Sequence, residues 1–427
     1  TKTRMKKVLI ISYYWPPNSG SGVQRWLKFS KYLKKNNWDP IIVTPKNPYS
    51  ELFDEKLSEE IENINVLKFP IWEPYSLKDK IFGKSKKPQN SGLVSKDKSL
   101  KDFCLNWIRG NFFVPDPKKY WVKPTTDHLI KYIEENKINH IISTGPPHSM
   151  HLIGLGVKKR FNHIKWIADF RDPWSKLDLL DDFYLTKRTR FKHIQLEKQV
   201  LENSDLVLTV SEKWATDFKN LGSSNVKIIK NGYDKQDFID FTISKSEKFV
   251  IGHYGILNHL RNPIELWKSL NELCKSETEF NNRLEIHLSG NIDPKVIDSI
   301  NSYEHLKDKL QLLGFLNHKD VIKAYSKTSL LLLLLFNSES GKGNYPGKLF
   351  EYLATKLPIL AFGPENSDVQ NLLKNNYGSY FSYDDSKNIK DEILLIFNKQ
   401  IKYKHIEDDR FTREKLTLDL VDILDKL

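Results

Sequence analysis

The chain has 427 residues, which exceeds the size at which one hydrophobic core usually stops growing and predicts two domains of roughly 200 residues each. With 39% hydrophobic residues it is a globular chain and not a disordered one. Cys104 and Cys274 are too few for a disulfide framework or a zinc site, so we expect a reducing, cytoplasmic location. No stretch approaches the ~20 apolar residues that a membrane span requires.

The net charge of +13 is concentrated in one segment. Residues 76–124 hold twelve Lys or Arg, four Asp and seven aromatic residues. Basic residues mixed with aromatic ones suit an anionic membrane surface or nucleic acid. The alternative is a solubilising surface whose aromatic side chains pack inward. Of the possible partners we expect peripheral contact with an anionic membrane, on the inner face of the cytoplasmic membrane, and no nucleic acid.

The first half of the chain begins as a doubly wound α/β domain. An apolar run at 8–11 predicts a strand, Gly20 and Gly22 lie in the following loop, and apolar residues at helical spacing begin at Val23. A strand, a glycine-bearing loop, a helix and another strand form the opening of such a domain. The later strands of this half are predicted at 41–44, 64–69, 140–143, 165–168 and 206–210, with helical patterns such as 190–203 between them.

The second half repeats this plan. Strands are predicted at 249–254, 284–288, 310–313, 330–336 and 358–361, with helices at 262–274, 318–326 and 348–355. The stretch 233–247 is polar and has no strand pattern, so the domain boundary belongs there. We therefore predict an N-terminal acceptor-binding domain at 5–235 and a C-terminal donor-binding domain at 236–409. A last helix at about 410–427 is predicted to pack back on the first domain.

The segment GKGNYPGKLFEYLATKLPILA, residues 341–361, carries the most chemistry. A glycine-rich loop leads into a helix, whose free N–H groups and dipole favour a diphosphate at Gly347. Lys348 adds a positive charge there, and Glu351 lies in the first turn, where its carboxylate can reach a ribose diol. The alternative is an ordinary loop-to-helix junction with an acid placed to suit the dipole.

This segment resembles the donor-binding signature of the retaining glycosyltransferases of the GT-B architecture, family 4 and its near relatives. The run EYLATKLPILA at 351–361 matches the family pattern Glu-Tyr/Ala-Leu/Met-Ala, a few variable residues, then Pro-Val/Ile-Leu/Ile-Ala. The resemblance implies an α/β fold of two Rossmann-like domains that face each other across a deep cleft. It also implies that Glu351 binds the nucleotide ribose.

Other matches extend the resemblance over nearly the whole chain. IKNGYD at 229–234 is similar to the family hinge Pro-Asn-Gly-x-Asp, and GHYG at 252–255 followed by Arg261 is similar to the glycine-rich element that opens the second domain. LGF at 313–315, with Tyr325 after it, resembles the edge of the nucleotide-base pocket. The donor-binding residues that follow are Gly20, Gly22, Gly255, Arg261, Phe315, Tyr345, Gly347, Lys348, Leu349 and Glu351.

Two positions depart from the family pattern. Gly343 stands where the family often has a glutamate that contacts the transferred sugar, and Ile256 stands where an arginine tends to follow the second-domain glycine. Arg261 and Lys348 would then share the neutralisation of the diphosphate. Two cations and the helix N–H groups can stabilise a departing nucleoside diphosphate. The chain contains no Asp-x-Asp, so we expect transfer without a metal or other cofactor, with the nucleotide sugar as co-substrate.

The first domain supplies further candidates at the ends of its strands. His148 follows the 140–143 strand, and the related enzymes place a first-domain histidine near the transferred sugar, where it can shuttle a proton. Asp169 ends the next strand and is predicted to be catalytic together with His148, Arg261 and Lys348. The predicted acceptor-binding residues are Arg25, Asp172 and Trp174. Structural roles, as an exposed helix arginine, a helix-start histidine or a salt-bridged turn, are the alternatives.

Together with the resemblance, these observations predict transfer of a sugar from a nucleoside-diphosphate sugar to a hydroxyl of a cell-surface glycan, such as a lipopolysaccharide or capsule precursor, or a lipid-linked saccharide. The resemblance implies a bacterial source and retention of the anomeric configuration. A sugar-nucleotide 2-epimerase on the same fold is one alternative, since it needs no acceptor. A basic binding protein that has lost catalysis is the other, because of Gly343.

Overall fold

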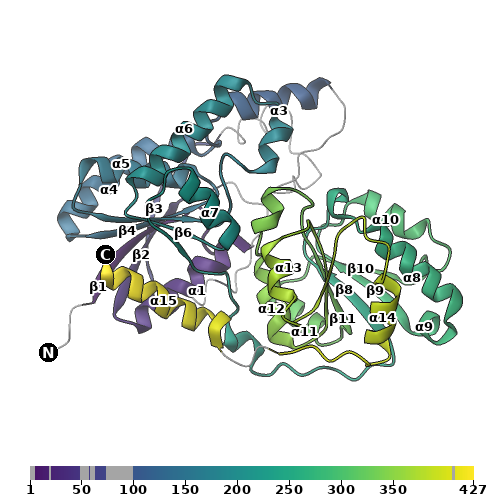
Figure 1. Cartoon of the computed structure of the whole chain (residues 1–427). Helices are drawn as coiled ribbons and strands as arrows, with labels where there is room; N and C mark the ends of the chain where they lie inside the picture. The colour runs from purple at the N-terminus through teal and green to yellow at the C-terminus, as the bar shows by residue number, and fades with distance from the viewer. Residues whose placement is uncertain (1–4, 19–20, 49–56, 58–62, 74–99, 406–408) are drawn as a thin grey trace. The chain divides into compact units, whose positions relative to one another are not determined.

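A computed structural model describes residues 5–18, 21–48, 57, 63–73, 100–405 and 409–427. The chain divides into two compact units (Figure 1). Unit 1 comprises Thr1–Lys230 together with Arg413–Leu427, and unit 2 comprises Asn231–Thr412. The sequence predicted the two domain boundaries at 235/236 and 409/410, and the units of the structure meet at 230/231 and 412/413. The chain therefore leaves unit 1, builds unit 2 and returns.

Unit 1 contains a seven-stranded parallel sheet in the order β3-β2-β1-β4-β5-β6-β7. Its central strands are apolar on both faces because helices cover both sides, as in other parallel sheets. The strands are β1 (Lys6–Ile11), β2 (Trp38–Pro45), β3 (Asn65–Phe69), β4 (His140–Gly145), β5 (Lys165–Phe170), β6 (Leu206–Thr209) and β7 (Val226–Ile228).

Helices of unit 1 lie on both faces of this sheet, with α4 and α5 on one face and α1 and α15 on the other (Figure 1). Ser211 and Thr186 cap the helices that follow them through their hydroxyl oxygens, which accept the N–H groups of Trp214 and Thr189. The helices are α1 (Ser21–Lys35), α3 (Leu100–Phe112), α4 (Lys119–Asn136), α5 (Ser149–Arg160), α6 (Lys187–Asn203), α7 (Glu212–Asn220) and α15 (Arg413–Lys426), with a 3₁₀ helix η2 (Asp178–Phe183).

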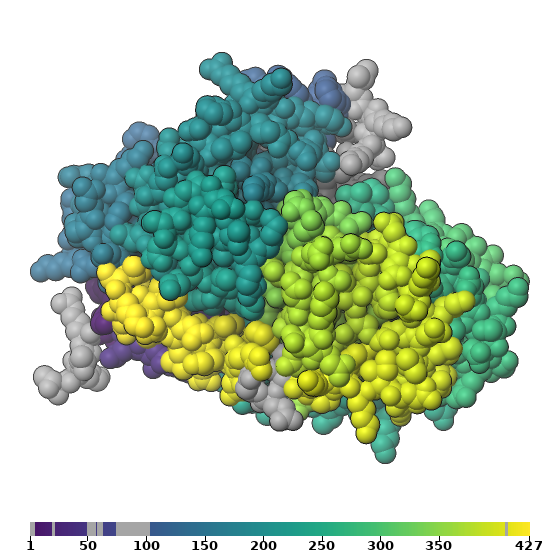
Figure 2. All heavy atoms as spheres, viewed as in Figure 1, coloured from purple at the N-terminus to yellow at the C-terminus, as the bar shows by residue number. Residues whose placement is uncertain are grey.

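The C-terminal helix α15 completes the core of unit 1. Leu416, Leu420 and Leu424, spaced one helical turn apart, are buried in the same cluster as Trp26 and Val8. In the space-filling view α15 appears in yellow along the surface of this unit (Figure 2).

Unit 2 contains a six-stranded parallel sheet in the order β10-β9-β8-β11-β12-β13. Its central strand β11 is a run of five leucines, all buried, which is the pattern of a strand covered on both faces. The strands are β8 (Phe249–Tyr254), β9 (Leu284–Ser289), β10 (Leu310–Gly314), β11 (Leu330–Leu334), β12 (Ile359–Phe362) and β13 (Ser379–Phe381).

Four helices of unit 2 bury their apolar sides in one core on one face of this sheet, and α11, α12 and α13 lie on the other (Figure 1). The four are α8 (Ile264–Ser276), α9 (Thr278–Arg283), α10 (Pro294–Asn301) and α14 (Ile389–Phe397). The other three are α11 (His318–Tyr325), α12 (Gly347–Thr355) and α13 (Asp368–Leu373), and the short 3₁₀ helices are η3 (Lys235–Phe238), η4 (His259–Arg261), η5 (Ser340–Gly343) and η6 (Asp409–Phe411).

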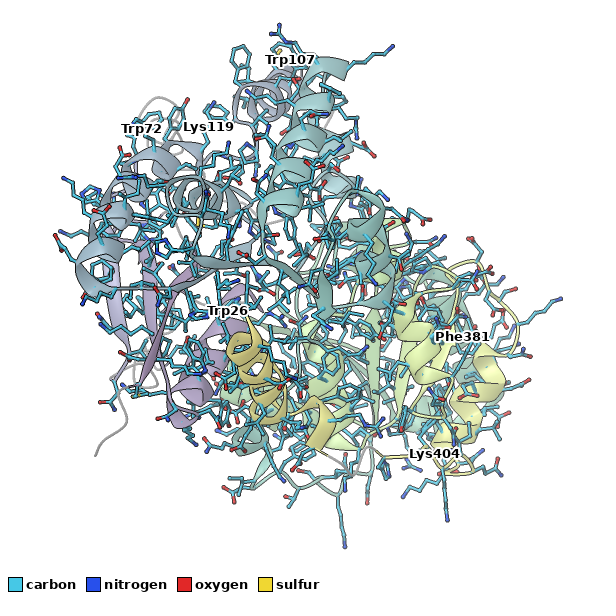
Figure 3. The ribbon with its side chains drawn as sticks, turned by 60° about the vertical axis from the view of Figure 1, so that its left-hand side comes forward. Trp26, Trp72, Trp107, Lys119, Phe381 and Lys404 are labelled. Atoms are coloured by element: carbon cyan, nitrogen blue, oxygen red, sulfur yellow. The ribbon has the colours of Figure 1, made fainter. Side chains whose placement is uncertain are left out.

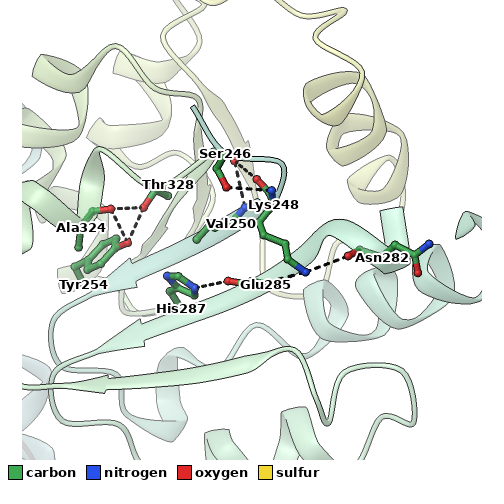
Figure 4. Close-up of polar contacts among 10 residues, drawn as sticks. Ser246, Lys248, Val250, Tyr254, Asn282, Glu285, His287, Ala324 and Thr328 are labelled. Carbon is green, nitrogen blue, oxygen red and sulfur yellow. Dashed lines mark hydrogen bonds and ion pairs between the residues drawn. The ribbon is translucent and has the colours of Figure 1, made fainter. Parts of the chain in front are cut away.

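The end of β8 is held firmly in this unit. The Tyr254 hydroxyl lies 2.6 Å from Thr328 Oγ1 and donates to Ala324 O at 3.3 Å, which ties the strand end to the end of α11 (Figure 4). At the start of β8, the N–H of Val250 donates to Ser329 Oγ. These bonds fix where the loop after Tyr254 leaves the sheet.

Each strand predicted from the sequence is present, with ends that differ by a few residues. The α/β prediction is therefore confirmed, and so are two Rossmann-like units with parallel sheets. Among the described residues, no helix has both the length and the apolar character needed to cross a membrane.

Candidate active site

The candidate site in unit 2 lies at the point where the strand order of its sheet reverses. β8 and β11 are neighbours, yet the chain runs outward from β8 to β9 and β10 on one side and from β11 to β12 and β13 on the other. In open α/β sheets, ligands bind outside the carboxyl ends of the strands at such a switch point. Gly255 and Arg261 follow β8, and Gly347, Lys348 and Glu351 follow β11, so the predicted donor residues gather at this point.

The N-terminus of α12 is open. Pro346 precedes the helix with an extended backbone, and its side chain makes no capping bond. A Cβ atom placed on Gly347 would meet nothing within 4 Å. An uncapped helix start beside open space offers N–H groups and the positive end of the helix dipole to an anion.

Lys348 reaches from this helix to the loop after β8. A Cβ atom on Gly255 would lie 2.8 Å from the Lys348 Nζ, and Gly255 has a φ of +132°, a backbone conformation that favours glycine. Burial, together with the positive charge of Arg261, lowers the pKa of Lys348 to about 7, although Glu351 acts in the opposite direction. The ammonium group is therefore held close to the loop without a full counter-charge.

Arg261 is fixed by its own loop. Its Nη2 donates to Ile256 O at 2.6 Å, and its guanidinium lies 4.6 Å from the centre of the Phe336 ring. Beneath the loop, burial and then the charges of Lys348 and Arg261 hold the pKa of His253 well below its usual range, so this imidazole is neutral. Lys348 and Arg261 therefore lie close to each other above a neutral imidazole, that of His253.

The Glu351 carboxylate has two partners that the sequence did not indicate. Its Oε1 lies 3.1 Å from His318 Nε2, and its Oε2 accepts the Tyr325 hydroxyl at 2.9 Å. Burial and the Glu351 charge raise the pKa of Tyr325 well above its usual range, so Tyr325 stays a proton donor. His318 begins a helix whose Asn317 cap is visible in the sequence, but its pairing with a residue 33 positions away is not.

Two other predicted donor residues have buried side chains. The Tyr345 side chain is buried and donates to Asp368 O at 2.8 Å, and Leu349 is fully buried with its N–H bonded to Pro346 O. Their side chains hold the loop and the helix in place and do not present groups to a ligand. Phe315, by contrast, is 61% exposed, and Gly343 lies buried in the short helix η5 before the loop.

In unit 1, the switch point lies between β1 and β4. Gly22 is the second residue of α1. A Cβ atom there would lie 3.0 Å from the Tyr14 ring and 3.1 Å from Arg171 Nη1, so these two side chains pack against the glycine. Gly20 lies outside the described residues. Arg171 itself donates to Pro146 O at 2.6 Å.

Arg25 and Asp169 have a structural position, which differs from their predicted acceptor-binding and catalytic roles. Arg25 Nη2 donates to Asp169 Oδ1 at 2.9 Å, and the two side chains are 1% and 0% exposed. Asp169 Oδ2 also accepts from Trp26 Nε1 and from the Thr144 hydroxyl. The prediction gave Arg25 to the acceptor and Asp169 to catalysis, with a salt-bridged structural role as an alternative, and this network encloses both side chains.

His148 and Trp174 stack on one another, with ring centres 5.0 Å apart and planes at 4°. Both are buried, and burial, followed by the charges of His151 and Arg171, holds the pKa of His148 well below its usual range. Neither ring nitrogen of His148 has a hydrogen-bond partner among the described residues. A neutral imidazole with unused nitrogens can still accept or donate one hydrogen bond to a ligand.

Asp172, two residues before Trp174 in the sequence, is half-buried. Burial raises its pKa to about 6, against the opposing effect of Arg171, and the charge of Asp169 raises it further. A carboxyl group with this pKa can take up a proton near neutral pH. Across the described ranges, no group of three or more His, Cys, Asp or Glu side chains is arranged to hold a metal ion.

No protein-family model matches the sequence, and no curated protein matches it. Solved structures do match over their whole length. A glycosyltransferase from Rickettsia africae is 13% identical with a TM-score of 0.63, and 99% of each chain is covered. The lipopolysaccharide outer core galactosyltransferase WaaB is 11% identical with a TM-score of 0.59, and 99% of this chain and 100% of that chain are covered. The chain has the GT-B fold.

The GT-B fold is shared with enzymes of other activities. A UDP-GlcNAc 2-epimerase from Neisseria meningitidis, solved with UDP-GlcNAc bound, is 12% identical to this chain with a TM-score of 0.55, and 99% of this chain and 100% of that one are covered. At these identities the likeness establishes the fold, and the chemistry has to be argued from the residues.

Proposed function

We propose that this GT-B chain is a retaining glycosyltransferase that uses a nucleoside-diphosphate sugar and works without a metal ion. The observation that carries the proposal is the convergence of Lys348, Arg261 and the open start of α12 at the switch point of unit 2. Transferases and a nucleotide-sugar epimerase share this fold, which adds support for a nucleotide-sugar donor.

Stabilisation of the leaving diphosphate is the main requirement of this reaction. When the glycosidic bond to phosphate breaks, negative charge develops on the diphosphate oxygens, and preorganised cations and N–H groups stabilise that charge. Lys348, Arg261 and the first N–H groups of α12 are suited to this task. By resemblance we propose departure and attack on the same face of the sugar, which retains the anomeric configuration.

The acceptor side of the proposal rests on the family resemblance. We propose a hydroxyl of a bacterial cell-surface glycan or lipid-linked saccharide precursor as acceptor, with His148, Asp172 and Trp174 of unit 1 as the residues to test first. A half-buried carboxyl group with a pKa of about 6 can accept a proton from an attacking hydroxyl. Incubation of the donor without an acceptor separates transfer from 2-epimerisation, since only an epimerase would yield a new sugar nucleotide.

Thermal unfolding against a panel of UDP, GDP, ADP and their hexose esters tests the donor site, in parallel samples with and without EDTA. One of these nucleotides, at ~100 times its dissociation constant, should stabilise the protein by about 2.7 kcal/mol. Glu351→Ala removes a charged hydrogen-bond acceptor worth about 2 kcal/mol, so the same concentration should stabilise this variant by less than about 1 kcal/mol.

Glu365→Ala is the matched control, because Glu365 is an exposed glutamate after β12. It should keep the full stabilisation. The absence of stabilisation by every nucleotide in the panel would contradict the proposal. Stabilisation that EDTA removes would contradict the metal-independent part of it alone.

The low pKa of Lys348 predicts a pH dependence of donor binding. A bound diphosphate raises the pKa of the ammonium group above its value of about 7 in the free protein. Above pH 7 binding must therefore take up a proton, so affinity should fall by up to about tenfold per pH unit. Below pH 7 Lys348 is already charged, and this dependence should vanish.

Calorimetric titration with a nucleoside-diphosphate sugar measures this effect, because its diphosphate keeps the same charge between about pH 6 and 8.5. Two buffers with different ionisation enthalpies count the protons taken up. Lys348→Arg stays charged throughout and should lose the dependence. Equal slopes for the wild-type protein and this variant would assign the proton uptake to another group.

A further inference from the structure

Exposed aromatic side chains gather on one surface of unit 1. Among the described residues seven aromatic side chains are strongly exposed, and only Phe315 belongs to unit 2. The other six, which we call the aromatic face, are exposed by 45–62% and are Trp72, Phe103, Phe112, Tyr120, Tyr184 and Phe191. Single exposed apolar residues are ordinary, but a clustered set marks an interaction surface.

Contacts between the elements connect the parts of this face, and the Lys119 ammonium donates to Phe112 O at 2.5 Å, which joins the start of α4 to the end of α3. The Phe103 and Tyr184 ring centres are 4.6 Å apart, and the Trp72 and Tyr120 ring centres are 4.9 Å apart. Asn111 at the end of α3 accepts the N–H of Thr186 at 2.9 Å, which ties α3 to the start of α6. Trp72, Lys119 and Trp107 lie at the outer edge of the unit, whereas Trp26 lies inside (Figure 3).

The fold holds these rings outward. The inner side of α3 carries Gly110, where a Cβ atom would lie 2.6 Å from Phe183 Cβ and 2.7 Å from Leu185 Cδ2. The helix α3 therefore packs closely against residues 183–185 at this glycine, and Phe112 on the same helix stays 60% exposed. Exposure of the aromatic face is thus a property of the packed structure.

The surroundings of the aromatic face are basic. Residues 100–124 and 184–196 together contain nine Lys or Arg and two Asp. Asp116, one of the two, accepts bonds from Ser149 and Lys118. The aspartates of η2 border the face, and one of them, Asp181, is paired with Arg190. The exposed basic residues Arg188 and Lys192 on α6 stand beside Phe191.

Positive charges repel one another here. Partial burial and the nearby charge of Lys192 lower the pKa of Lys119, whose ammonium lies 5.1 Å from the centre of the Tyr120 ring. An anion bound between Lys119 and Lys192 would relieve this repulsion. A second copy of the chain would not, because a two-fold contact would bring this basic surface against itself.

We propose that the aromatic face docks on the surface of a lipid bilayer that carries anionic headgroups. Aromatic side chains enter the headgroup region, where one side is apolar and the other is wet, and Lys and Arg bind the lipid phosphates. The surface comprises Trp72, α3, Tyr120, Tyr184 and the first half of α6, so it extends beyond the basic segment recognised in the sequence. Residues 76–99 of that segment lie outside the described residues, and the proposal does not need them. The proposal is also independent of the proposed transferase activity.

Co-sedimentation of the full chain with vesicles tests this surface. The wild-type protein should bind vesicles of phosphatidylglycerol and phosphatidylcholine and should not bind phosphatidylcholine alone, and binding should weaken with added salt. Phe112→Ser/Phe191→Ser and Arg188→Glu/Lys192→Glu should each weaken binding by at least about tenfold. Leu395→Ser/Leu418→Ser, which changes two exposed apolar residues elsewhere, should bind like the wild-type protein.

Three results would overturn the proposal. These are no binding to anionic vesicles, undiminished binding by the aromatic double variant, and a dimer that the aromatic double variant dissociates without any vesicle binding by the wild-type protein. Urea unfolding of the same variants, expected to match that of the wild-type protein, shows that they are folded. Because the vesicle measurement needs no nucleotide, failure of this proposal is separate from failure of the transferase proposal.

Discussion

Lys348→Met should lower the kcat/KM of sugar transfer or donor hydrolysis by about 10²–10³, the loss measured when one charge-stabilising donor is removed from an enzyme site. Lys348 reaches the loop after β8 from α12, since its Nζ lies 2.8 Å from the position of a Cβ on Gly255. Methionine keeps the length and the apolar stem, so the change removes mainly the charge. The measurement is release of the nucleoside diphosphate from the donor that the thermal panel identifies.

Lys356→Met is the matched control for this experiment. Lys356 lies at the opposite end of the same helix and is exposed. It should keep activity within about twofold, because surface substitutions away from a site have small effects. If Lys348→Met kept more than a third of the wild-type activity, the leaving diphosphate would have to be stabilised by other groups.

Asp169→Ala should destabilise unit 1 by about 3–5 kcal/mol, the cost of leaving one partner of a buried ion pair without its counter-charge. The substitution isolates the buried Arg25 guanidinium and also removes the acceptor of Trp26 and Thr144. Urea unfolding followed by tryptophan fluorescence measures the effect on this unit, since nine of the ten tryptophans lie in unit 1.

Two further variants show whether the charge is the cause. Asp127→Ala breaks the exposed Lys123–Asp127 pair and should change the free energy of unfolding by at most about 1 kcal/mol. Arg25→Met/Asp169→Leu removes both buried charges and should recover most of the loss. A double variant as unstable as Asp169→Ala would attribute the effect to packing and not to the unpaired arginine.

The sequence allowed the fold to be predicted because its strands have a simple pattern. Five leucines in a row at β11 can only be a strand covered on both faces or a buried helix, and the short length decides between them. The glycine-rich loop at 341–347 and the helix that follows were recognisable for the same local reason. The strands β7 and β13, three residues each, were missed because so short a run carries no periodicity.

The contacts between distant residues could not be predicted. Arg25 and Asp169 are 144 positions apart, and nothing local distinguishes a buried arginine from an exposed one on a helix that is apolar on one side. His318 and Glu351 pair through the neighbouring ends of two helices, which the sequence places only as separate elements. Tyr345 and Leu349 were assigned by register within a motif, while their burial depends on packing against the rest of unit 2.

The return of the chain to unit 1 has a consequence for synthesis on the ribosome. Leu416, Leu420 and Leu424 of α15 belong to the core of unit 1, but they are translated only after the whole of unit 2. At ~5–20 residues per second, the roughly 180 intervening residues take about 10–40 s to synthesise. During that time the nascent unit 1 carries an apolar strip on α1 that its own last helix has yet to cover, and a chaperone bound there would be displaced when α15 emerges.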